Sequence, residues 1–170
     1  MQPATTPEGE TCAPSPGAVS PSPGAGRVVA RLARQVDQVL GGIGLTSRQY
    51  RLLAFLSEAD HAASRLADLL AVSNSSITAL VDGLVSRGLV ERRDVPTDRR
   101  KVHHCITTEG RKTLRTADDA LDEFFGELRS ELQPADQAAA DAGLARWGQA
   151  LDRRRGKDGS KDKQAERSRR

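Results

Sequence analysis

The sequence contains few aromatic residues, few cysteines and no long apolar run. Aromatic residues make up 3% of the 170 residues, so leucine, valine and alanine must form most of a modest core in a single domain. Two cysteines, Cys12 and Cys105, do not make a disulfide framework, and no apolar stretch is long enough to cross a membrane. The first 26 residues hold no lysine or arginine, so we expect no secretory signal peptide and a reducing, cytoplasmic setting.

Motifs of catalysis are also absent. The sequence has no nucleophile elbow, no glycine-rich phosphate loop and no histidine and glutamate residues at metal-ligand spacing. His103, His104 and Cys105 are adjacent, but neighbours in a strand point to opposite faces, so His104 would face inward and only two ligands would share a side. Cys12 lacks the positive, structured surroundings that activate a thiolate. We therefore expect no enzyme activity, no cofactor and no metal ion.

Positive charge is concentrated near the C-terminal end. Residues 1–26 have a net charge of −2, and residues 153–170 carry nine basic against three acidic residues, a net charge of +6. The residues between them have a net charge of −1, so binding to nucleic acid must be argued from local charge. Residues 1–26 and 154–170 are predicted to be disordered. Two roles stay open for the basic tail, namely non-specific DNA affinity or solubility.

Two helices are predicted before the most informative stretch. Apolar residues at helical spacing predict a helix that begins at Arg27 and ends at the Gly41–Gly42 pair. Thr46 is the expected N-cap of the next helix, because Gln49 three residues later completes a capping box. This helix is predicted to run through Ser57, and a loop is expected at 60–61.

A helix-turn-helix pattern follows. Ser64 is predicted to cap a short helix, Ala71 and Val72 to form the turn, and Ser73 to cap the next helix, with Ser76 three residues on. A buried stripe in this helix leaves short, mostly uncharged residues outward, namely Asn74, Ser75, Thr78, Asp82 and Ser86. Such side chains approach phosphates and base edges closely, and free N–H groups at a helix start attract phosphate. The alternative is that the serine-rich start is only a cap.

A basic hairpin comes directly after this helix. Gly88 ends the helix, strands are predicted at 89–93 and 101–107, and a turn is predicted at 94–98. At the tip, Asp98 is expected to hold Arg99 or Arg100 in place, which leaves the other arginine free to enter a narrow, negatively charged minor groove. The alternative is a solvated charged loop.

Two long amphipathic helices complete the pattern. Leu114, Ala117, Leu121, Phe124, Leu128 and Leu132 recur at spacings of three and four residues over more than five turns. Pro134 then opens another helix, in which Ala140, Leu144, Trp147 and Leu151 lie on one side. This apolar stripe is too long for one small domain to cover, so its remaining face is best buried on a second copy of the chain.

These parts, in this order, resemble the MarR family of bacterial transcription regulators. The resemblance rests on LADLLAVSNSSITALVDGLVSRGLVERR, on Asp98-Arg99-Arg100, and on Ile106-Thr107 followed by Glu109-Gly110 and a long helix. It implies a mainly α fold with a small β-wing, in which a winged helix-turn-helix domain at 46–107 adjoins a helical dimerisation region at 27–45 and 108–153. It further implies an obligate homodimer that binds a palindromic operator in double-stranded DNA and is released by a small-molecule or oxidant effector.

The resemblance also assigns site residues. Ser73, Asn74, Ser75, Ser76 and Thr78 fall on the family's recognition helix, and Asp98 and Arg100 fall on its wing tip. Three residues depart from the family's pattern: Ala79 replaces a longer polar side chain but can touch a thymine methyl, Gly83 lies mid-helix, and His104 replaces an aliphatic residue. The predicted DNA-contacting residues are Ser73, Asn74, Ser75, Ser76, Thr78, Ala79, Arg92, Arg99, Arg100 and Lys101, with Asp98 in a structural role.

The function predicted from the sequence is therefore a dimeric, sequence-specific DNA-binding repressor. The first alternative is a winged-helix module whose same surface binds a protein. The second is a redox or metal switch that acts through Cys105.

Overall fold

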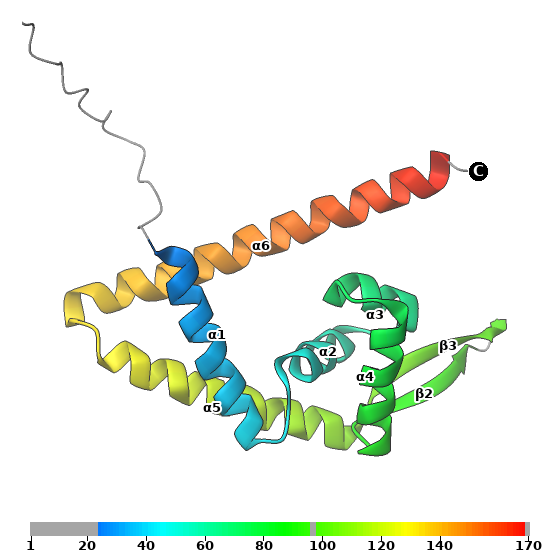
Figure 1. Cartoon of the computed structure of the whole chain (residues 1–170), viewed down its shortest axis with the longest axis horizontal. Helices are drawn as coiled ribbons and strands as arrows, with labels where there is room; N and C mark the ends of the chain where they lie inside the picture. The colour runs from blue at the N-terminus through cyan, green and yellow to red at the C-terminus, as the bar shows by residue number, and fades with distance from the viewer. Residues whose placement is uncertain (1–23, 96–97, 169–170) are drawn as a thin grey trace, which may run out of the picture.

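Helices dominate the structure. A computed structural model describes residues 24–95 and 98–168, and the side chains of 24–94 and 102–154. Residues 1–23 of the arm predicted at 1–26, the turn residues 96–97 and the final residues 169–170 lie outside the described part. Figure 1 shows a small sheet beside a group of short helices, with two longer helices extending away. The elements are α1 (Ala25–Gly42), α2 (Ser47–Glu58), β1 (His61–Ala62), α3 (Ala63–Leu70), α4 (Asn74–Ser86), β2 (Val90–Val95), β3 (Asp98–Ile106), α5 (Thr108–Ser130) and α6 (Pro134–Ser168).

The start of α2 has the predicted capping box. The Thr46 hydroxyl accepts a hydrogen bond from the Gln49 amide N–H at 3.2 Å, and the Gln49 side-chain oxygen accepts one from the Thr46 amide N–H at 3.0 Å. Two amide donors that the first helical turn leaves free are thereby satisfied, which fixes where α2 begins.

The helix-turn-helix is held by backbone geometry at both ends of α4. The turn residue Ala71 adopts the left-handed conformation, with φ 53°, and the Ser73 hydroxyl accepts from the Ser76 amide N–H at 3.3 Å. Gly88, with φ 69°, follows the end of α4 and turns the chain into β2. These features confirm the predicted turn, cap and stop. The short helix α3 is present as predicted, but its predicted cap was wrong: the helix begins at Ala63, and Ala62 rather than Ser64 is the N-cap.

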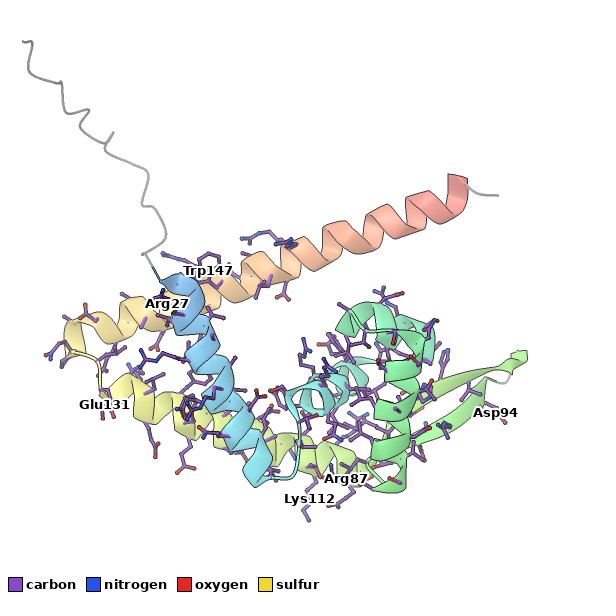
Figure 2. All side chains as sticks on the ribbon, viewed as in Figure 1. Arg27, Arg87, Asp94, Lys112, Glu131 and Trp147 are labelled. Atoms are coloured by element: carbon purple, nitrogen blue, oxygen red, sulfur yellow. The ribbon has the colours of Figure 1, made fainter. Side chains whose placement is uncertain are left out.

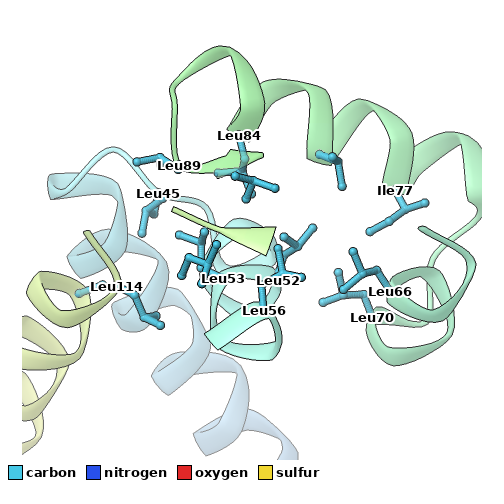
Figure 3. Close-up of a cluster of buried hydrophobic side chains, with 14 of the residues drawn as sticks. Leu45, Leu52, Leu53, Leu56, Leu66, Leu70, Ile77, Leu84, Leu89 and Leu114 are labelled. Carbon is cyan, nitrogen blue, oxygen red and sulfur yellow. The ribbon is translucent and has the colours of Figure 1, made fainter. Parts of the chain in front are cut away.

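The core is built almost entirely from leucine and other aliphatic residues, as the scarcity of aromatic residues predicts. Side chains fill the space between α2, α3, α4 and the sheet (Figure 2), and Figure 3 shows the leucines of α2 directed toward those of α3 and α4. The largest of the side chains that are less than 2% exposed are Leu40, Leu52, Leu53, Leu56, Leu66, Ile77, Val81, Leu84 and Val90. Burial of each such side chain contributes roughly 1.5–3 kcal/mol to folding.

Strand β1 lies where a loop was predicted. His61 and Ala62 pair antiparallel with His104 and His103 of β3, which makes the sheet order β1-β3-β2. The ring of His104 faces inward, as predicted, and is 6% exposed, with its Nδ1 3.2 Å from the His61 carbonyl oxygen. A two-residue strand carries no periodic pattern of its own, so the pairing depends on this tertiary contact rather than on local sequence.

The burial of His104 predicts a stability that depends on pH. Burial lowers the pKa of His104 below its usual value, while the hydrogen bond to His61 opposes that effect and the nearby Arg92 adds to it. The unfolded chain, with an ordinary histidine pKa of about 6.5, therefore takes up the proton more readily than the folded chain. We expect the free energy of unfolding to fall as the pH drops below about 6.5, and a His104→Leu variant to lose part of this dependence in urea titrations.

The matched control is His103→Gln, which changes a less buried neighbour on the same strand. This variant is expected to keep the pH dependence. An unfolding free energy that stays constant from pH 7 to pH 5 in the wild-type chain would contradict the buried position of His104.

Helix α5 joins the winged domain to the rest of the molecule. α1 and α2 both pack against it, and the Tyr50 hydroxyl of α2 donates a hydrogen bond to Asp118 of α5 at 2.8 Å. Burial and this hydrogen bond raise the pKa of Tyr50 to about 12, so the phenol remains a donor at any physiological pH. This hydrogen bond therefore adds a polar contact to the packing of α2 against α5.

Helix α6 turns back at Pro134 and continues much further than predicted (Figure 1). Residues 154–168 were predicted to be disordered, but the helix runs to Ser168. The segment holds three lysines and three arginines, which are good helix formers, and it holds no proline, although it also contains two glycines. At the other end of the chain, α1 begins at Ala25, two residues earlier than predicted.

Within the described residues, no single helix has both the length and the hydropathy required to cross a membrane; α3 and α4 reach that hydropathy only as a pair bent by 106°.

Candidate nucleic-acid interface

The first turn of α4 is presented to solvent. Ile77, Val81 and Leu84 are buried against the core, which turns the opposite side of the helix outward. Each of the predicted reading residues on α4 and its cap is exposed, namely Ser73, Asn74, Ser75, Ser76, Thr78 and Ala79. The structure therefore brings these six residues together on one surface, which we call the α4 face.

Hydrogen bonds within the α4 face arrange its hydroxyl groups. The Ser73 hydroxyl lies 3.0 Å from that of Ser75 and 2.8 Å from that of Ser76. The Thr78 hydroxyl donates to the Asn74 carbonyl oxygen at 2.9 Å. Several hydroxyl hydrogens are thus already engaged, and the first turn has a defined geometry before any ligand arrives.

The hairpin of β2 and β3 extends beside α4 (Figure 1). Arg92 of β2 forms an ion pair with Asp82 of α4, and Arg93 pairs with Glu91. Arg92 was predicted to contact DNA, but the structure gives its guanidinium an intramolecular partner. An exposed pair of this kind adds at most about 1 kcal/mol of stability, so its main consequence is to tie the hairpin to α4.

The basic residues near the hairpin tip lie in a strand rather than in a turn. Strand β3 begins at Asp98 instead of Lys101, and Val95 pairs with Asp98, so the two strands reach almost to the tip. The predicted site residues Asp98, Arg99, Arg100 and Lys101 therefore belong to β3. Their side chains lie outside the described part of the structure, and the predicted contact between Asp98 and an arginine stays a prediction.

A cation that the sequence reasoning missed lies on the other side of α4. Arg48 of α2 is exposed and, together with Gln49, Ser76 and Ala79, lines an open hollow of about 370 Å³ between α2 and the α4 face. The guanidinium of Arg48 has no ion-pair partner among the described residues. Arg48 lies at the start of the helix that precedes the helix-turn-helix. This position in the sequence could have identified it as a candidate for DNA contact.

The cysteine of the histidine and cysteine cluster is buried. Cys105 is 2% exposed, and burial together with a hydrogen bond to Asp60 raises the pKa of its thiol to about 11. The thiol is therefore protonated at neutral pH, which disfavours reaction with oxidants. In the described part of the chain, no three histidine, cysteine, aspartate or glutamate side chains are grouped so that they could hold a metal ion.

Comparison with known proteins finds matches over the same region. Residues 43–101 match a model of the MarR family. The HTH-type transcriptional repressor YetL of Bacillus subtilis (strain 168) is 37% identical over 82 residues, which cover 46% of this chain and 49% of YetL. The chain thus spans about half the length of this relative.

Solved structures share the wider fold. The transcriptional regulator BldR from Sulfolobus solfataricus superimposes with a TM-score of 0.59 at 28% identity, covering 75% of this chain and 89% of BldR. A MepR mutant from S. aureus, bound to an oligodeoxyribonucleotide, gives a TM-score of 0.58 at 22% identity, covering 74% of this chain and 94% of MepR. The second likeness concerns the fold alone.

Proposed function

We propose that the chain is a member of the MarR family and a sequence-specific DNA-binding transcription regulator that acts as a homodimer on a palindromic operator. Its residues 43–101 match the model of that family, and YetL is similar over 82 residues. The observation that carries the proposal is the position of the α4 face beside the basic β2–β3 hairpin. In a winged helix-turn-helix, the second helix enters the major groove, and its first residues meet the base edges.

Cations on both sides of the α4 face support DNA as the partner. Arg48 lies on one side, and the hairpin that carries Arg99, Arg100 and Lys101 lies on the other. Arginines so placed can contact the phosphates that flank a major groove, and one at the wing can enter the adjoining minor groove, where a narrow groove attracts positive charge.

Exposed apolar residues on the long helices support a dimer. Trp147 of α6 is 70% exposed and stands out from the helix (Figure 2), and Leu144 and Leu151 on the same side are 57% and 64% exposed. Further exposed apolar side chains are Val28 and Val29 of α1, Leu128 of α5, and Leu132 in the connection that follows α5. We propose that a second copy covers this apolar face, defined by these seven residues, because monomers rarely expose so large an apolar surface. A C2 dimer would then present two α4 faces about 34–36 Å apart, which matches one turn of B-form DNA.

Repression is the mode of regulation we favour, because the relative YetL is a repressor. Release would follow when a small molecule binds more tightly to the conformation that cannot contact DNA than to the conformation that can. The buried, protonated thiol of Cys105 disfavours oxidation as the trigger.

One observation also favours a second candidate function. No residue of α4 is basic, and the helix carries Asp82. A helix of this kind could instead bind a protein surface, and the salt dependence of binding separates the two. DNA binding with several phosphate contacts weakens by roughly 10³ or more between 50 and 200 mM salt, whereas a largely uncharged protein interface should change far less.

The test measures binding to DNA from upstream of the protein's own gene by fluorescence anisotropy across a salt series. Arg100→Ala is expected to weaken binding by about tenfold or more without unfolding the chain, and Arg48→Ala to lower the salt slope by about 1. Arg34→Ala removes a similar charge from the exposed face of α1 and should change neither quantity. Binding that Arg100→Ala leaves untouched would show that the wing assignment is wrong.

A further inference from the structure

The α4 face contains no group that reads guanine in the usual way. The commonest specific contact with DNA is a bidentate hydrogen bond from arginine or lysine to guanine O6 and N7. Between Asn74 and Ser86, α4 holds neither residue type, and its one charged side chain, Asp82, is paired with Arg92. The reading surface is therefore electrically neutral, although cations flank it.

Two hydroxyl groups of α4 are also poor donors toward bases. The Thr78 hydroxyl donates to the Asn74 carbonyl oxygen at 2.9 Å, and the Ser86 hydroxyl donates to the Gly83 carbonyl oxygen at 3.0 Å. With its hydroxyl hydrogen engaged, Thr78 retains a methyl group and an acceptor oxygen. The next residue, Ala79, adds a second exposed methyl group.

One amide remains available for hydrogen bonding. Asn74 is exposed at the first position of α4, and among the described residues its side-chain amide has no hydrogen-bond partner. An asparagine amide matches adenine, to whose N6 and N7 it can bond in a bidentate manner, and a methyl group in the major groove matches the C5-methyl of thymine.

We infer that α4 reads A·T base pairs: Ala79 and Thr78 contact thymine methyl groups, and Asn74 bonds to adenine. The inference rests on the proposed function and adds the class of sequence that this helix selects. If the operator contains guanines that the protein contacts, those contacts come from residues outside α4, such as those of the hairpin.

The first experiment selects binding sites for the full-length chain from a pool of random duplex DNA. A·T pairs are expected at the positions of each half-site that the protein protects in the major groove. Replacing one of these thymines by deoxyuridine removes a single methyl group, and we expect affinity to fall about fourfold, as for one buried CH₂ group. A pool that yields no enriched sequence contradicts the proposed function itself. Enriched sites with G·C at those positions, or sites insensitive to deoxyuridine, overturn only the inference.

The second experiment changes the reading chemistry. An Ala79→Arg variant should fold, because position 79 is exposed and arginine is a good helix former. It is expected to prefer guanine at one position where the wild-type chain selects an A·T pair, by roughly fivefold or more. The control Ala59→Arg adds the same charge at the exposed end of α2. If the two variants strengthen binding to all sequences alike, without a change in the preferred base, position 79 does not face the bases.

Discussion

A Gly110→Ala variant is expected to lose about 3 kcal/mol or more of its free energy of unfolding. The added Cβ would overlap the Leu89 carbonyl oxygen and come within 2.8 Å of Ile106 Cγ1. The Leu89 carbonyl cannot easily retreat, because it accepts a hydrogen bond from the Thr107 amide N–H at 3.1 Å. The Thr107 hydroxyl in turn accepts from the Gly110 amide N–H at 3.0 Å and donates to the Gly88 carbonyl oxygen at 2.7 Å. These hydrogen bonds therefore hold the start of α5 close to the beginning of β2.

Urea unfolding followed by circular dichroism measures this loss. The matched control is Gly83→Ala in α4, where an added Cβ meets no atom within 4 Å. This control is expected to gain about 1 kcal/mol, because alanine loses less backbone entropy in a helix than glycine. A Gly110→Ala variant as stable as the wild-type chain would contradict the close approach of α5 to Leu89.

A Leu144→Glu, Trp147→Glu double variant is expected to convert the proposed homodimer into a monomer. Each glutamate would place an unpaired charge within the apolar face that we propose is covered by a second copy. The molar mass from light scattering should fall from twice 18.3 kDa to 18.3 kDa. Affinity for a palindromic operator should fall by about 10² or more, because the two reading surfaces are no longer linked.

The control Gln149→Glu adds a negative charge on the opposite side of α6, where residue 149 is exposed. This variant should remain a dimer and bind DNA as the wild-type chain does. A wild-type chain that is itself a monomer, or a double variant that keeps the dimer mass, would show that the apolar face is not the dimer interface.

The winged domain could be predicted well because its boundaries depend on local chemistry. Each helix boundary is set by residues only a few positions apart: Thr46 and Gln49 cap α2, Ser73 and Ser76 cap α4, and Gly88 follows the end of α4. The local sequence therefore contains the information needed to place these boundaries. The inward position of His104 followed from strand alternation in the same way.

The features that sequence reasoning missed depend on contacts between distant segments. β1 forms because His61 meets His104 across 43 positions of the chain, and Arg92 is engaged because β2 runs beside Asp82. Arg48 joins the site only through the packing of α2 against α4. The local sequence pattern does not show which residues from distant segments will be in contact. The helical segment at 154–168 was missed for another reason, since its composition of charged residues suits a solvated helix as well as a disordered tail.

The central claim is that a paired helical body presents two copies of the α4 face and hairpin to one side of a DNA duplex. Hydroxyl-radical footprinting of the wild-type protein on its selected operator tests this claim most directly. We predict two symmetric protected patches on one face of the duplex, with centres about 10 base pairs apart. A single asymmetric patch, or two patches on opposite faces, would contradict it.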